Sequence, residues 1–66
     1  MLVWINGEPR ELPAGARVRD ALAALDAPET GVAVAVDGAV VPRADWSATD
    51  LIEGAHVEVL TAVQGG

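Results

Sequence analysis

The chain has 66 residues, enough for one small domain, and ten acidic residues against four arginines give it a formal net charge of −6. This acidity excludes the basic stripe that nucleic acid requires and disfavours anionic membranes, so we expect neither as a partner. No charged and apolar leader opens the sequence, which predicts a cytoplasmic protein.

The residue types that are missing restrict the chemistry. The chain has no cysteine and no lysine, and therefore no thiolate nucleophile, thiolate metal site or Schiff-base amine. His56 is its single histidine and is expected to be a surface residue rather than a metal ligand. We expect a protein that binds or is acted upon, with no catalytic residue, no metal and no bound cofactor.

The first elements read as a β-hairpin. Residues 1–5 are apolar and β-prone, and Asn6-Gly7 after them is a strong signal for a type I′ turn. Residues 8–12 would form the return strand. Pro9 has no N–H to donate, so this strand should lie at a sheet edge.

A helix should follow, because apolar residues recur at helical spacing along one stripe. Arg17 stands where a capping serine, threonine or aspartate would serve, and Pro28 should end the helix by about Asp26. The stripe consists of Val18, Ala21, Leu22 and Leu25.

The second half predicts another hairpin and a last strand. Residues 32–36 alternate as VAVAV, Asp37-Gly38 signals a second primed turn, and residues 39–41 return. A single helical turn is expected at 44–46 and a final strand at 56–63. The order predicts an α+β domain over residues 1–63, a mixed sheet of about five strands with one helix across one face, followed by a flexible tail at 64–66.

The tail consists of Gln64, Gly65 and Gly66. Two glycines allow a backbone to enter a slot too narrow for any Cβ, and Gly66 would present a terminal carboxylate. A frayed end is the alternative explanation.

These features together resemble the ThiS family of sulfur carriers in thiamin biosynthesis, whose fold is the ubiquitin-like β-grasp. The resemblance rests on Asn6-Gly7, on Pro13-Ala14-Gly15, on Val41-Pro42-Arg43 with Trp46 three residues on, and on Gly65-Gly66. Two departures are Arg17 in place of the usual capping threonine and Ala55 in place of a frequent acid.

The resemblance implies a role as a protein cosubstrate rather than an enzyme. An E1-like adenylyltransferase (ThiF-like) would consume ATP to adenylate the carboxylate of Gly66, with Gln64 and Gly65 entering its active site. A sulfur donor such as a cysteine desulfurase would then supply the sulfur of a thiocarboxylate, which a thiazole synthase (ThiG-like) would consume. The roles of Arg43 and His56 stay open.

The resemblance also implies a partner-binding surface on the side of the sheet away from the helix. Val3, Ile5, Val57 and Val59 would point under the helix, whereas Trp4, Glu58 and Leu60 would point outward. We predict that the partner-binding surface includes Trp4, Leu60 and Ala62, with Trp4 and Leu60 near each other.

Two alternatives remain from the sequence. The small subunit of molybdopterin synthase (MoaD) resembles this chain in fold and tail, although its usual chain is longer and Val-Pro-Arg-x-x-Trp favours ThiS. A ubiquitin-like docking domain with an inert tail is the other. Intact mass after incubation with an E1-like enzyme, ATP and a sulfur donor would separate a carrier from a docking domain.

Overall fold

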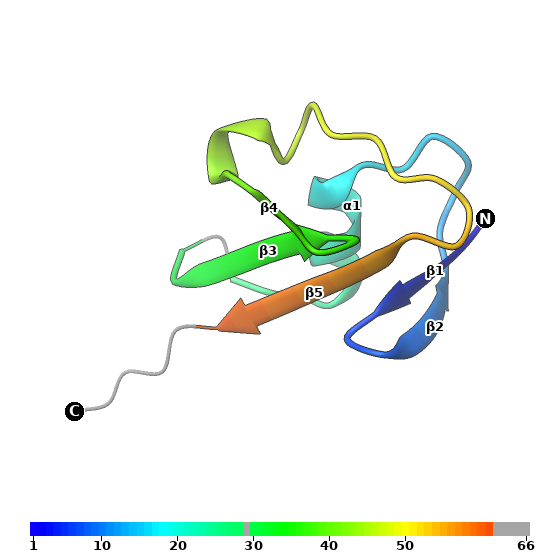
Figure 1. Cartoon of the computed structure of the whole chain (residues 1–66), viewed down its shortest axis with the longest axis horizontal. Coiled ribbons are helices and arrows are strands. Elements are labelled where there is room, and N and C mark those ends of the chain that lie inside the picture. Colours follow the sequence, from blue (N-terminus) through cyan, green and yellow to red (C-terminus); the bar gives the residue numbers. More distant parts are fainter. Residues whose placement is uncertain (29, 62–66) are drawn as a thin grey trace.

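The computed structural model describes residues 1–28 and 30–61, and their strands form one five-stranded sheet in the order β2-β1-β5-β3-β4 (Figure 1). β1 and β5 are parallel neighbours, and the other pairings are antiparallel. Proline-containing β2 lies at one edge, as predicted from its missing N–H. The strands are β1 (Leu2–Ile5), β2 (Glu8–Glu11), β3 (Val32–Val36), β4 (Ala39–Val41) and β5 (His56–Thr61).

Both hairpins turn through two residues with positive φ. Asn6 and Gly7 have φ of 52° and 81°, and Asp37 and Gly38 have φ of 49° and 87°. This is the type I′ geometry, whose twist matches that of the flanking strands. The two short hairpin signals of the sequence are therefore confirmed.

The helix α1 (Val18–Ala24) covers one face of the sheet and carries the predicted stripe inward. The core is entirely apolar among the described residues, which suits a chain with few polar groups to satisfy inside. Its members come from the inner face of the sheet, from the connection between β2 and α1, from α1 and from the long connection before β5: Val3, Ile5, Leu12, Ala16, Val18, Ala21, Leu22, Val34, Trp46, Leu51, Ala55, Val57 and Val59.

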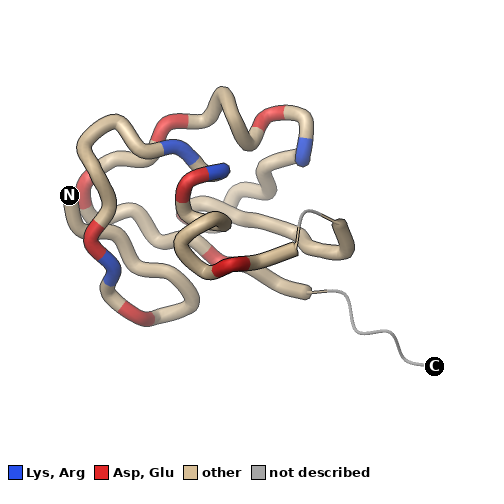
Figure 2. Tube along the Cα trace, turned by 180° about the vertical axis from the view of Figure 1, so that it is seen from behind, with Lys and Arg blue, Asp and Glu red and all other residues tan. Residues whose placement is uncertain are grey.

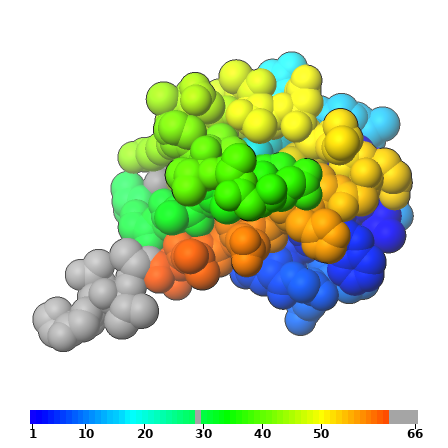
Figure 3. All heavy atoms as spheres, viewed as in Figure 1, coloured from blue at the N-terminus to red at the C-terminus, as the bar shows by residue number. Residues whose placement is uncertain are grey.

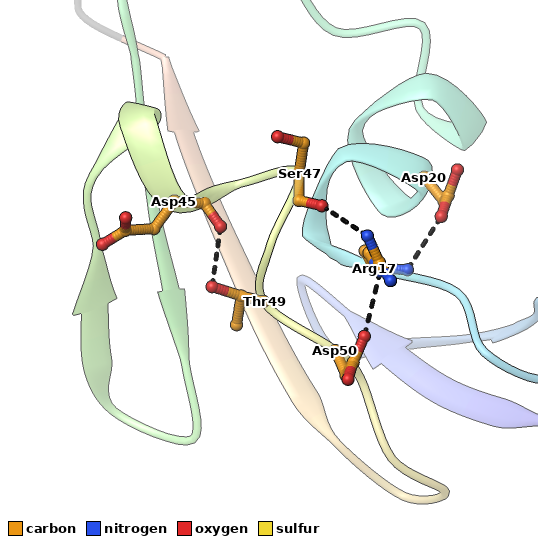
Figure 4. Close-up of polar contacts among 6 residues, drawn as sticks. All are labelled: Arg17, Asp20, Asp45, Ser47, Thr49 and Asp50. Atoms are coloured by element: carbon orange, nitrogen blue, oxygen red, sulfur yellow. Dashed lines mark hydrogen bonds and ion pairs between the residues drawn. The ribbon is translucent and has the colours of Figure 1, made fainter.

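The start of α1 is capped in an unexpected way. A guanidinium has no acceptor, so the side chain of Arg17 cannot receive a helix N–H. Instead, the Asp20 carboxylate accepts the backbone N–H of Arg17 at 2.8 Å, which is the carboxylate half of a capping box. The Arg17 side chain donates to Asp50 Oδ1 at 3.0 Å and to the Ser47 carbonyl at 2.9 Å (Figure 4).

The Val-Pro-Arg-x-x-Trp motif folds into a single 3₁₀ turn, η1 (Arg43–Asp45), one residue earlier than expected. Trp46 is buried and fills the core beside it, and its indole Nε1 donates to the Val41 carbonyl at 2.9 Å. Pro42, with φ of −61°, begins the turn, and its carbonyl accepts the Asp45 N–H at 2.8 Å.

Candidate functional site

The face of the sheet that α1 leaves uncovered is the candidate partner-binding surface, which we call the outer face. Figure 3 views this face, where β5 runs between β3 and β4 on one side and β1 and β2 on the other. The predicted alternation is confirmed along β5, because Val57 and Val59 are buried whereas Glu58 and Leu60 are exposed. On β1, Val3 and Ile5 are buried and Trp4 is half-buried.

Trp4 pairs in register with His56 rather than with a residue near Leu60. Their rings are stacked, with centroids 5.9 Å apart and planes inclined by 7°. His56 is exposed, as expected for a surface histidine, and its backbone N–H donates to Asp37 Oδ1 at 3.0 Å. This aromatic pair could not be predicted from the sequence, because it depends on the parallel register of two strands whose paired residues, Trp4 and His56, are 52 positions apart.

Leu60 lies on the same face as Trp4 but not beside it, which corrects the expected closeness of these two residues. Leu60 is four residues along β5 from His56, a separation of about 13 Å at strand spacing. On that face, Glu58 lies between Leu60 and the stacked pair of Trp4 and His56. Leu60 instead pairs with Ala33 of β3.

The apolar part of the outer face therefore centres on Leu60 and the β3–β4 side. Leu60 is 68% exposed and Val40 of β4 is 76% exposed. Val40 pairs with Ala35, which in turn pairs with Glu58, so β4 extends the face away from β1. A shallow hollow beside Leu60 is lined by Gly31, Val32, Ala33 and Thr61. The sequence reasoning missed Val40, although its alternation with Ala39 and Val41 was compatible with an outward position.

The remaining site residues predicted from the sequence, Ala62, Gln64, Gly65 and Gly66, lie outside the described residues. The register shows toward which end of the sheet the described part of β5 runs. Thr61 pairs with Val32, the first residue of β3, so β5 runs to that end of the sheet. The turn η1 lies at the same end of the molecule (Figures 1 and 2).

The described residues contain neither a metal-binding group nor a helix able to span a membrane. Within residues 1–28 and 30–61, no group of three or more histidine, aspartate or glutamate side chains could hold a metal ion. No helix in the same part of the chain has the length and apolar character needed to cross a membrane. The acidic residues are spread along the described chain over several elements (Figure 2).

Comparisons with known proteins agree with one another. The chain is 27% identical over 66 residues to the sulfur carrier protein ThiS of Escherichia coli K12, with all of both chains covered. The crystal structure of a thiamine biosynthesis protein (ThiS) from Geobacter metallireducens matches with a TM-score of 0.82 and 30% identity over all of both chains. An NMR structure of a thiamine biosynthesis protein from the same organism matches with a TM-score of 0.78 and 32% identity, covering all of this chain and 88% of that one.

These structural matches confirm the β-grasp fold. The family model for the ThiS family matches residues 3–66, which is nearly the whole chain and includes both tail glycines. The chain therefore belongs to the ThiS family.

Proposed function

We propose that this protein is a sulfur carrier of thiamine biosynthesis and that it acts as a protein cosubstrate. The observation that carries the proposal is the family match, which continues through Gly65 to Gly66 on a fold shared with ThiS structures. The residue inventory supports it, since a chain without cysteine cannot hold sulfur on a thiol of its own. The C-terminal carboxylate of Gly66 is then the group that carries the sulfur.

The chemistry begins with a poor electrophile. An α-carboxylate has a pKa of about 3.5 in model peptides and is ionised at neutral pH, so a nucleophile does not attack it. An E1-like adenylyltransferase joins the carboxylate to AMP from ATP and releases pyrophosphate, which creates a good leaving group. A persulfide from a donor such as a cysteine desulfurase displaces AMP, and a thiol then cleaves the acyl disulfide to release the thiocarboxylate.

Thiazole synthase is the proposed consumer of this thiocarboxylate. The domain itself contributes a docking surface and an arm. The outer face around Leu60 supplies exposed apolar area next to the end of β5, from which the chain continues toward Gly66. The exposed area around Leu60 and the last described residue of β5 lie at one end of the sheet. A partner that binds the outer face there is therefore also positioned to bind the tail.

The tail variants test the proposal. We expect that deletion of Gly66, extension by one alanine and Gly65→Val each abolish thiocarboxylate formation. One added residue moves the carboxylate by up to about 3.6 Å, and misplacement by about 1 Å can slow a geometry-limited reaction about 100-fold. Valine adds a β-branched side chain and narrows the accessible φ/ψ range.

The measurements are ATP–pyrophosphate exchange and intact mass with an E1-like enzyme, ATP and a sulfur donor. The parent protein should gain the mass difference between one sulfur and one oxygen atom. Melting temperature serves as the control, because none of the three changes alters a described core side chain and stability should stay within about 0.5 kcal/mol. The carrier hypothesis would be falsified if the deletion and the extension both reacted at the parental rate.

A further inference from the structure

The exposed guanidinium of Arg43 is held out from the domain by a rigid turn. The turn is tied at several points: Trp46 Nε1 donates to the Val41 carbonyl, the Trp46 N–H donates to the Arg43 carbonyl at 3.2 Å, and the Thr49 hydroxyl donates to the Asp45 carbonyl at 2.8 Å. Burial of the Trp46 ring anchors the whole turn in the core. The backbone that carries Arg43 therefore has little freedom, which lowers the entropy lost when its side chain binds.

Arg43 is not used inside the domain. Its side chain makes no hydrogen bond or ion pair with another residue of the described chain, including Asp45 in the same turn. The other arginines are engaged: Arg10 donates to the Ala24 carbonyl at the end of α1, Arg17 pairs with Asp50, and Arg19 also has a partner. Solubility does not explain Arg43, because a positive charge reduces the net charge of an acidic domain.

The strand register places Arg43 and the last described residues of β5 at the same end of the sheet. Val34 of β3 pairs with Val41 on one side and with Val59 on the other, so β4 and β5 run in the same direction. Arg43 follows Val41 by two residues, just as Thr61 follows Val59. The turn η1 and the end of β5 accordingly share one end of the molecule (Figure 2).

We propose that Arg43 docks this domain on its activating enzyme by pairing with a carboxylate at the opening through which the tail enters. The inference rests on the proposed function and names a contact for that partner. An acidic domain associates best with a largely basic surface on its partner. A single positive group at the end of the sheet where β5 finishes then fixes the orientation of the domain on that surface, because it pairs with an acidic group at only one place. A wrongly oriented encounter would leave the tail pointing away from the active site.

A carboxylate fits the position of Arg43 better than the phosphates of ATP do. Five residues separate Thr61 from the end of the chain, and extended they span up to about 17 Å. The reacting carboxylate must reach the α-phosphate at the far end of this arm, whereas Arg43 stays on the folded domain. Arg43 therefore meets the rim of the partner's site, where planar guanidinium–carboxylate pairing is favourable.

The test compares Arg43→Gln with Arg10→Gln. The second variant removes one positive charge from β2, the edge strand farthest from β4. Both are assayed by ATP–pyrophosphate exchange with the ThiF-like enzyme over a range of carrier concentrations. We expect Arg43→Gln to raise KM about tenfold with kcat unchanged, and Arg43→Glu to raise it further. Arg10→Gln should stay within about twofold of the parent, and Arg43→Lys should recover part of the loss.

Three outcomes would overturn the docking role. The first is a parental KM for Arg43→Gln, and the second is an equal rise in KM for Arg10→Gln, which would indicate a general charge effect. The third is a fall in kcat at constant KM, which would indicate contact with ATP. Failure of the parent protein to support exchange at all would instead count against the proposed function, so the two failures are distinguishable.

Discussion

Asn6 shows how one residue can serve both the turn and the sheet. Its backbone adopts positive φ, which asparagine tolerates better than most residues. Its side-chain amide then pairs with Val59 of β5: Nδ2 donates to the Val59 carbonyl at 3.2 Å, and Oδ1 accepts the Val59 N–H at 2.8 Å. The side chain thus continues the β1–β5 ladder for one residue after β1 has ended.

Substitutions at Asn6 should separate these two contributions. Asn6→Gly keeps the turn and loses both side-chain bonds, so we expect a loss of about 1–2 kcal/mol in unfolding free energy. Asn6→Ala loses the same bonds and keeps a Cβ in the left-handed region without the polar side chain that makes this region tolerable for asparagine, so it should lose about 2–4 kcal/mol. Urea denaturation measures both variants, and hydrogen exchange at the Val59 amide should accelerate in each. Parental stability of Asn6→Gly would show that the side-chain pairing contributes nothing.

At the scale of elements, the long connection between η1 and β5 is fixed to the start of α1. The N–H of Val18 donates to the Thr49 carbonyl at 3.0 Å, and the N–H of Leu51 donates to the Ala16 carbonyl at 2.9 Å. The Arg17 side chain adds its contacts with Ser47 and Asp50 (Figure 4). Arg17 therefore joins two elements in place of capping one.

Arg17→Ala should destabilise the domain by about 0.5–1 kcal/mol, because the ion pair is largely exposed and contributes little in water. Arg17→Thr should recover part of this loss, since a threonine hydroxyl can accept a helix N–H. Denaturant titrations at low and high salt measure both variants, and salt should shrink the effect of Arg17→Ala. Arg43→Ala removes the same charge without a described contact and is the control. An equal loss of unfolding free energy in Arg17→Ala and Arg43→Ala would show that the contacts of Arg17 with Ser47 and Asp50 do not stabilise the domain.

The whole molecule has two unlike faces, and only one of them is used for folding. The apolar side chains of the inner face are buried under α1, whereas Leu60 and Val40 on the outer face are exposed to solvent. Exposed apolar area of this kind is the basis on which we propose that the outer face is an interaction surface. Ile52, in the connection before β5, is as exposed as Leu60 at 68% but lies near the start of β1, since Gly54 donates to the Leu2 carbonyl.

Leu60→Asp and Ile52→Asp form a matched pair for testing this surface. We expect Leu60→Asp to raise the KM of adenylation about tenfold or more, because it places a charge in the centre of the proposed docking surface. Ile52→Asp should change KM by less than about twofold. Both residues are exposed, so thermal melting should show similar stability for the two variants. Equal KM values for the two variants would contradict a docking role for the outer face.

The sequence by itself determined the local structure, because its signals act over a few residues. Asn6-Gly7 and Asp37-Gly38 specify their turns through positive φ, the stripe from Val18 to Leu25 specifies one helix face, and Pro9 excludes a central strand. Alternation placed Val57 and Val59 on one face and Leu60 on the other, and the resemblance to the ThiS family was needed to say which face lies under the helix.

Only the tertiary structure decided which distant residues meet, because strand register depends on the packing of the whole core. It placed His56 rather than Leu60 beside Trp4, brought Val40 into the outer face, and joined Arg17 to Asp50 across the connection. It also left Arg43 exposed at the end of the sheet where β5 finishes, since the anchoring of Trp46 in the core sets the direction of η1. No spacing along the chain carries that information, because these pairs are brought together by the closure of a single apolar core.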